Sequence, residues 1–193
     1  MGAAFEASEY RQREKTATTE MQARGIDTLV VLAEANLCYL TGYEGFSDYV
    51  PQAAVLRAGD QDVILILREM DLFCAYPTVY LDESRVESYP ENYIGTPSKS
   101  PWEEIGKRII EIAQGGRVGV EFGANVFSYQ DYGWLTKVLE GQEIVDGTGV
   151  VQKAKIKKSA AEIAYMHQAA AVVDNALQLG IADIAEGVRE CDV

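Results

Sequence analysis

The chain of 193 residues is 48% hydrophobic and 24% charged, a composition typical of a globular protein that buries a core. Its formal net charge of −13, from 30 acidic and 17 basic residues, argues against nucleic acid and anionic membrane surfaces as partners. No apolar run approaches the roughly 18 residues of a membrane span, and the N-terminus lacks the apolar core of a signal peptide, so we expect a soluble, cytoplasmic protein.

Helix and strand patterns alternate along most of the chain. A helix is predicted from Ser8 to Arg24, with Ser8 as its N-cap and Gly25 at its end. The apolar run Ile26–Leu32 is typical of a strand buried on both faces, and the next helix is predicted to end at Gly42. The other predicted elements, in chain order, are a hairpin around 58–61, a helix over 69–76, one strand within the long segment 78–101, a helix over 100–114, a strand over 117–122, a helix over 128–141 and a strand over 143–148. This alternation predicts an α/β fold, with one central mixed β-sheet flanked by helices.

The composition changes within the segment 146–159, which we interpret as a domain boundary. Ser159 and Glu162 form a capping-box pattern that starts a long amphipathic helix. We predict an α/β domain over residues 1–150 and, over 151–193, a linker and the opening helices of a second domain that is cut short. The alternative is a C-terminal helical pair that packs back on the sheet. The basic patch in this boundary, interpreted as a solvated linker face, consists of Lys153, Lys155, Lys157 and Lys158.

Motifs for independent catalysis are missing from the sequence. The glycines of 147–149 follow a predicted strand, but the third glycine of a dinucleotide loop is absent and no helix is expected directly after them, so we predict a plain turn. His167, the single histidine, lies in a helical pattern, and no GxSxG nucleophile motif occurs. Cys38, Cys74 and Cys191 form no CxxC pair, so we expect reduced, mostly buried thiols. We therefore predict no catalytic and no metal-ligating residue in this chain, and no activity of the chain alone.

The segment "NLCYLTGYEGFSDYVPQ" (36–52), between two predicted strands, is the most unusual stretch of the sequence. It carries four aromatic residues, two glycines and a proline, whereas a connection that only turned the chain would be shorter and more polar. Aromatic side chains beside polar groups are typical of binding surfaces and pocket walls. The alternative is a satellite apolar cluster beneath the loop. The candidate contact residues are Tyr43, Phe46, Asp48 and Tyr49.

The passages "MQARGIDTLVVLAEANLCYLTGYEG" (21–45) and "KIKKSAAEIAYMHQAAAVVDNAL" (155–177) stand in this order with a domain-sized gap between them. Together they resemble the creatinase/prolidase/aminopeptidase-P family, the pita-bread metallohydrolases. "MQARGIDTLVVLAEANLCYLTGYEG" matches the family's helix, its "RGID", its buried strand and its N-x-x-Y-L-T-G-Y pattern. "KIKKSAAEIAYMHQAAAVVDNAL" is similar to the family's passage into its catalytic domain. "TGYEGFSDYVPQ" together with "YPENYIGTP" resembles the creatinase and ectoine hydrolase branch more than the dipeptidases.

The resemblance implies an N-terminal α/β domain of creatinase type, truncated here before a pita-bread catalytic domain. In many members Asp, Asp, His, Glu and Glu hold two divalent metals, such as Mn, Co or Zn, but these ligands lie beyond the connecting helix. No metal ligand and no cofactor is therefore assigned to this chain.

The resemblance also implies a homodimer, in which the N-terminal domain of one subunit closes over the active site of the other. The loop with Tyr43, Phe46, Asp48 and Tyr49 would then bind a small amide or peptide substrate in trans. The leading hypothesis is a non-catalytic N-terminal domain of a C–N hydrolase. The alternative is a stand-alone, non-enzymatic interaction or dimerisation module, and a nucleotide-binding domain is disfavoured by the absent glycine loop.

Overall fold

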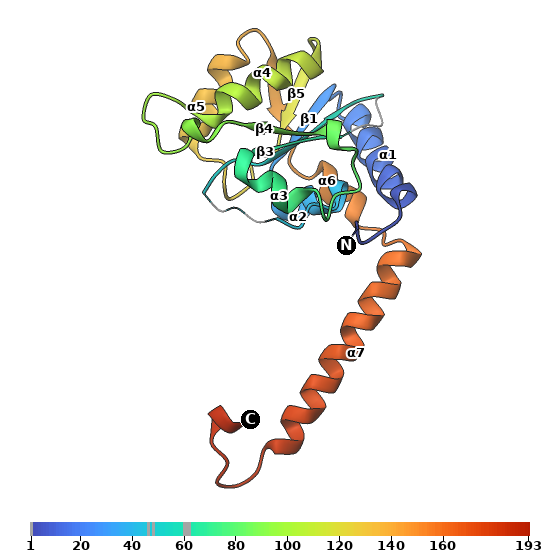
Figure 1. Ribbon diagram of the computed structural model, residues 1–193. Coiled ribbons are helices and arrows are strands. Elements are labelled where there is room, and N and C mark those ends of the chain that lie inside the picture. The colour runs from blue at the N-terminus through green and yellow to red at the C-terminus, as the bar shows by residue number, and fades with distance from the viewer. Residues whose placement is uncertain (1, 46, 48, 60–62) are drawn as a thin grey trace. The chain divides into compact units, whose positions relative to one another are not determined.

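The computed structural model describes residues 2–45, 47, 49–59 and 63–193. The chain forms two compact units, Met1–Lys155 and Ile156–Val193, and each is described by itself. The first unit contains a sheet of six strands between layers of helices (Figure 1). The strands are β1 (Thr28–Val31), β2 (Ala53–Arg57), β3 (Ile64–Arg68), β4 (Val86–Tyr89), β5 (Arg117–Val120) and β6 (Glu143–Asp146).

The sheet is mixed, as the sequence predicted, with the strand order β4-β3-β2-β1-β5-β6. β2 pairs antiparallel with both β1 and β3, and the β2–β3 pair is the predicted hairpin. The pairs β1–β5, β3–β4 and β5–β6 are parallel. Every residue of β1 is buried, which confirms the expectation of a strand covered on both faces. The predicted α/β fold is therefore confirmed.

Helices pack on both faces of this sheet (Figure 1). Side chains that alternate along β1, β2 and β3 point into two separate cores, one shared with α1, α2 and α6 and the other with α4 and α5. The helices are α1 (Ala7–Ala23), α2 (Glu34–Thr41), α3 (Leu72–Ala75), α4 (Pro101–Ala113), α5 (Tyr129–Val138), α6 (Val150–Lys155) and α7 (Ala160–Asp183), with short 3₁₀ turns η1 (Glu69–Asp71), η2 (Glu83–Arg85), η3 (Glu91–Tyr93) and η4 (Glu190–Asp192).

Local signals in the sequence mark most helix ends correctly. Gly25, at a φ of 65°, ends α1, and the next N–H bonds back to the Met21 carbonyl at 2.9 Å, as in a Schellman motif. The α4 helix begins directly after Ser100, whose side chain caps it and forms a capping box with Glu103. The predicted N-cap of the first helix was wrong, because α1 begins at Ala7 and the residue before it, Glu6, makes no side-chain cap.

The structure corrects the interpretation of the segment after β6. The α6 helix begins at Val150, directly after the three residues for which a turn without a following helix was predicted. Its apolar residues are buried and it packs against α1. The side chain of Lys153 forms an ion pair of 2.6 Å with Glu20, and Lys155 donates to the Asn36 side-chain oxygen at 3.2 Å. These two lysines therefore belong to the packed unit and not to a free linker face.

The cysteines also differ from expectation. All three are free thiols, as predicted, but Cys38, Cys74 and Cys191 are exposed instead of mostly buried. The three cysteines lie on α2, α3 and η4 with their side chains exposed, and composition alone does not reveal which way a helical side chain points.

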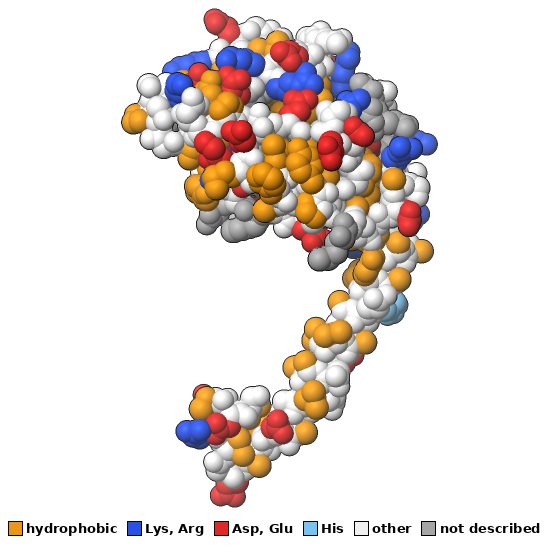
Figure 2. All heavy atoms as spheres, in the orientation of Figure 1, with side chains coloured by type: hydrophobic (Ala, Val, Ile, Leu, Met, Phe, Trp, Pro, Cys, Tyr) orange, Lys and Arg blue, Asp and Glu red, His pale blue; other side chains and the backbone are white. Residues whose placement is uncertain are grey.

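The second unit consists mainly of the long helix α7. The capping box of Ser159 and Glu162 starts this helix as predicted. None of the described α7 residues is buried, and Figure 2 shows hydrophobic side chains along much of the helix. His167 is exposed on α7. In the described part of the chain, no helix combines the length and the hydropathy that crossing a membrane requires.

Candidate functional site

The loop that the sequence singled out lies at one end of the sheet. It leads into β2, and β2 is antiparallel to β3, so the start of β2 lies beside the end of β3. β4 runs parallel to β3, so both strands end at this same edge. Described residues of this loop therefore lie near η1, which follows β3, and η3, which follows β4: Gln52 bonds Asp71, and residues 49–51 share a cavity with Tyr93.

A buried carboxylate fixes the helix that leads into this loop. Glu121, directly after β5, is only 1% exposed. Its carboxylate accepts hydrogen bonds from the main-chain N–H groups of Leu32 and Ala33, each at 3.0 Å, and from the Asn36 amide at 2.7 Å. These three bonds hold the start of α2, which ends at Gly42 in the left-handed conformation. No local pattern in the sequence marks Glu121, because its partners lie more than 80 positions earlier.

Tyr43 lies inside the protein. Its side chain is 2% exposed and belongs to the core shared with α1, α2 and α6. Its hydroxyl accepts a hydrogen bond of 2.9 Å from the Gln52 amide, which also donates to Asp71 at 2.9 Å. Burial raises the pKa of Tyr43 to about 12, and the nearby Asp71 carboxylate adds to this effect. This position favours the core alternative for Tyr43, and its role in substrate binding stays a prediction.

The ring of Tyr43 also explains a glycine in the loop. A Cβ atom at Gly45 would lie 2.1 Å from the ring and hydroxyl of Tyr43, a distance that no side chain tolerates. The far end of the loop is held as well, since the Tyr89 hydroxyl donates to the Pro51 carbonyl at 2.7 Å. The loop is thus packed at both of its ends.

Tyr49 is the described candidate that faces solvent. Its side chain is 67% exposed. The Arg68 guanidinium donates to its hydroxyl and lies 5.5 Å from the centre of its ring, within cation–π range. The two other candidates, Phe46 and Asp48, lie outside the described residues, so their roles stay predictions.

Arg68, at the end of β3, is a residue that sequence reasoning missed. Burial alone would lower the pKa of Arg68, but the hydrogen bond to Tyr49 and the charges of Asp71 and Glu91 raise it overall, so the group stays a cation. Its Nε atom lies 3.5 Å from a carboxylate oxygen of each acid. The spacing of Arg68 and Asp71, three positions apart, is a weak signal for an ion pair. The link from Arg68 to Tyr49 has no such signal.

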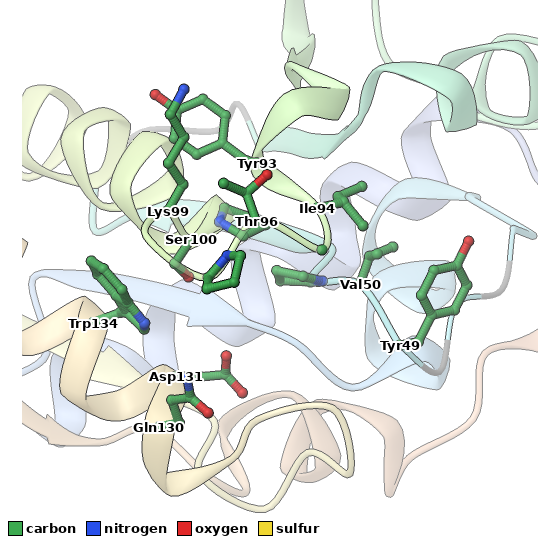
Figure 3. A pocket seen from close by; sticks show the side chains of 14 residues that line it. Tyr49, Val50, Tyr93, Ile94, Thr96, Lys99, Ser100, Gln130, Asp131 and Trp134 are labelled. Carbon is green, nitrogen blue, oxygen red and sulfur yellow. The ribbon is translucent and has the colours of Figure 1, made fainter.

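A cavity of about 420 Å³ adjoins Tyr49. Its walls come from the segment 49–51, the loop 93–101 and the first turns of α5. In Figure 3, Tyr49 and Trp134 lie toward opposite sides of the view, with Thr96 and Asp131 between them. Aromatic walls with a few polar groups suit a small polar ligand or a peptide segment.

Exposed apolar side chains lie next to this edge of the sheet. Met70, Phe73 and Tyr76 follow one another at intervals of three residues through η1 and α3, and Phe73 is 82% exposed. Figure 2 shows hydrophobic side chains gathered on the face of the first unit that carries α3. Among the described residues, no group of three or more His, Cys, Asp or Glu side chains lies close enough together to hold a metal ion.

Comparisons with known proteins agree with this fold. The family model of the creatinase/prolidase N-terminal domain matches residues 13–155. The uncharacterized hydrolase/peptidase y4tM of Sinorhizobium fredii is 35% identical over 98% of this chain, which covers 48% of that protein. The ectoine hydrolase of Halomonas elongata is 32% identical over 88% of the chain and 43% of that protein.

The solved structures show the same architecture. The Xaa-Pro dipeptidase from Bacillus anthracis superimposes with a TM-score of 0.73 at 17% identity, over 95% of this chain and 46% of that chain. This chain spans about half the length of the curated relatives it matches. The family match, residues 13–155, ends at the same residue as the first compact unit, Lys155. The chain therefore belongs to the creatinase/prolidase N-terminal domain family.

Proposed function

We propose that this chain is the non-catalytic N-terminal domain of a creatinase-like or Xaa-Pro peptidase-like C–N hydrolase. In this proposal it contributes to a homodimer and caps the active site of the partner subunit. The relatives named hydrolase/peptidase and ectoine hydrolase support the class, because this chain matches about half of each. The catalytic residues and any divalent metal, Mn, Co or Zn, would belong to the half that this chain does not span, in a cytoplasmic enzyme that acts on a small amide or peptide.

The exposure of Tyr49 is the observation that carries the capping role. A tyrosine that is 67% exposed and yet tied to a cation presents a large, ordered aromatic surface to something outside the unit. Tyr49 also lines the cavity of about 420 Å³. A wall of this kind excludes water from a neighbouring site and shapes it for a small polar substrate.

The apolar side chains of η1 and α3 support a contact with a second subunit. Met70 and Phe73 expose apolar side chains on η1 and α3, the elements that follow β3, and exposed apolar surface is typical of association sites. A stand-alone interaction module would use the same surface, so the two hypotheses differ in catalysis and not in contact. Turnover that depends on Tyr49 would decide for the hydrolase.

Tyr49→Ala, in a longer protein that carries this chain as its N-terminal half, tests the capping role. Loss of a wall contact worth about 1–3 kcal/mol in the transition state would lower kcat/KM about 5- to 150-fold. The matched control is Tyr129→Ala, since Tyr129 is a 91% exposed tyrosine at the start of α5 whose side chain does not line the cavity. Unchanged kcat/KM for Tyr49→Ala, or an equal loss in both variants, would refute the capping role.

Mixed dimers separate contacts within one subunit from contacts between subunits. A Tyr49→Ala subunit paired with a subunit whose catalytic half is inactivated combines one intact loop with one intact site. We expect partial recovery of turnover after subunit exchange. Exchange without recovery would show that the loop does not act on the partner.

A further inference from the structure

We propose that Arg68 is the positioning residue of Tyr49, and that its guanidinium holds the exposed ring in the orientation that the capping loop presents. This inference rests on the proposed function and adds the residue that sets the direction of the aromatic wall. It also assigns a supporting role to Tyr43, which is buried beneath the same loop.

Arg68 is itself held from several sides. Its side chain is 14% exposed, and its Nε atom lies 3.5 Å from oxygens of both Asp71 and Glu91. One terminal nitrogen lies 3.7 Å from the sulfur of Met70. The second carboxylate is tied to the same turn, since Glu91 accepts a hydrogen bond of 3.0 Å from the Met70 N–H. The guanidinium therefore has little freedom to rotate away from the loop.

Hydrogen bonds and one ion pair connect the buried Tyr43 with the exposed Tyr49. The Gln52 amide bonds both the buried Tyr43 hydroxyl and one oxygen of Asp71, each at 2.9 Å. The other oxygen of Asp71 faces Arg68, whose remaining terminal nitrogen donates to the Tyr49 hydroxyl. Because Tyr43 and Gln52 flank the loop, its two ends and its exposed ring are all fixed by one series of contacts.

This arrangement reduces the entropy lost when the ring meets a ligand. A free, exposed tyrosine would lose side-chain rotamer freedom on binding. A ring already held by a charge-assisted hydrogen bond loses less, so its contact is stronger for the same area. The alternative is that Arg68 only forms ion pairs with Asp71 and Glu91 at the end of β3 and does not orient Tyr49. The following experiment distinguishes this alternative from the positioning role.

Fluorine NMR of the 193-residue chain labelled with 3-fluorotyrosine reports the state of each ring. Tyr49→Phe identifies the Tyr49 signal among the 11 tyrosines. In Arg68→Met we expect this signal to narrow and move to its position in the unfolded chain. The matched control is Arg108→Met, since Arg108 binds Glu87 through two hydrogen bonds of 2.7 and 2.8 Å, away from the loop.

The signals of the other tyrosines show whether each variant is folded. If the tyrosine signals of Arg68→Met are no longer dispersed, that variant is unfolded and Arg68→Lys is used as the test variant instead. Lysine keeps the charge beside Asp71 and Glu91 but lacks the planar set of donors of arginine. An unchanged Tyr49 signal in the folded variant would overturn the proposal. An equal change in Arg108→Met would also overturn it.

A double-mutant cycle in the longer protein separates this inference from the capping role. If Arg68 acts through Tyr49, Arg68→Met combined with Tyr49→Ala lowers kcat/KM no further than Tyr49→Ala alone, within about twofold. A loss with Tyr49→Ala but none with Arg68→Met would overturn the positioning role and leave the capping role intact. A freed ring in Arg68→Met with unchanged kcat/KM in both single variants would overturn the capping role.

Discussion

Replacing Tyr43 by alanine tests whether the loop rests on a buried aromatic. Removing a fully buried aromatic side chain costs about 3–5 kcal/mol, and Tyr43 is 2% exposed. Its hydroxyl also accepts from Gln52, a bond worth roughly 1 kcal/mol, although that amide keeps its second partner, Asp71. We therefore expect Tyr43→Ala to lower the free energy of unfolding by about 4 kcal/mol.

Two companion variants divide this loss into its parts. Tyr43→Phe keeps the ring and removes the hydroxyl, so we expect a loss of about 1 kcal/mol. Tyr49→Ala removes an exposed ring with one hydrogen bond, so we expect a loss of at most about 1 kcal/mol. The loss in free energy of unfolding should thus be several-fold larger for Tyr43→Ala than for Tyr49→Ala, although both residues lie in the same loop.

Urea unfolding followed by tryptophan fluorescence measures these differences. Trp102 is fully buried in the first unit and reports its unfolding. A loss of about 4 kcal/mol lowers the urea midpoint by roughly 2 M when the denaturant slope is about 2 kcal/mol/M. A loss below about 1 kcal/mol for Tyr43→Ala would refute the assignment of this ring to the core, and equal losses for both alanine variants would refute the division of the loop.

Three other predictions concern the frame around the loop. Glu121→Gln should lower the free energy of unfolding by about 2–4 kcal/mol in the same assay, because its amide cannot accept all three hydrogen bonds; a loss below about 0.5 kcal/mol would contradict this. Hydrogen bonds from Lys153 and Arg24 lower the pKa of Glu20 below 4.5 in the folded state, so the ionised carboxylate stabilises the fold above pH 4.5, and this contribution is lost as the pH falls through the lowered pKa. Lys153→Met should therefore make the urea midpoint less dependent on pH in the acid range, and an unchanged dependence would contradict this. Amide hydrogens of α7 should exchange faster than those of β3, because no described α7 residue is buried; equal protection at monomeric concentration would refute this.

The sequence alone determined the elements and their class. N-cap residues and left-handed glycines act within a few residues, so the start of α4 and the ends of α1 and α2 could be predicted without a tertiary structure. Apolar runs and the hairpin predicted the mixed sheet, and two motifs in a fixed order predicted the family. The helix α6 escaped prediction because its six residues are helical only against α1, which supplies the surface that buries Val150 and Val151.

Only the tertiary structure decided which of Tyr43 and Tyr49 is buried and which is exposed. Composition marked Tyr43 and Tyr49 equally, yet one is buried and the other exposed, because the side chain's direction depends on how the loop packs over the end of the sheet. Arg68 is 19 positions from Tyr49 and meets it only because β2 and β3 pair antiparallel, which brings the end of one strand beside the loop that precedes the other. Glu121 reaches the start of α2 through the parallel pairing of β1 and β5. Strand pairing joins residues that are distant in sequence, and no local pattern records such contacts.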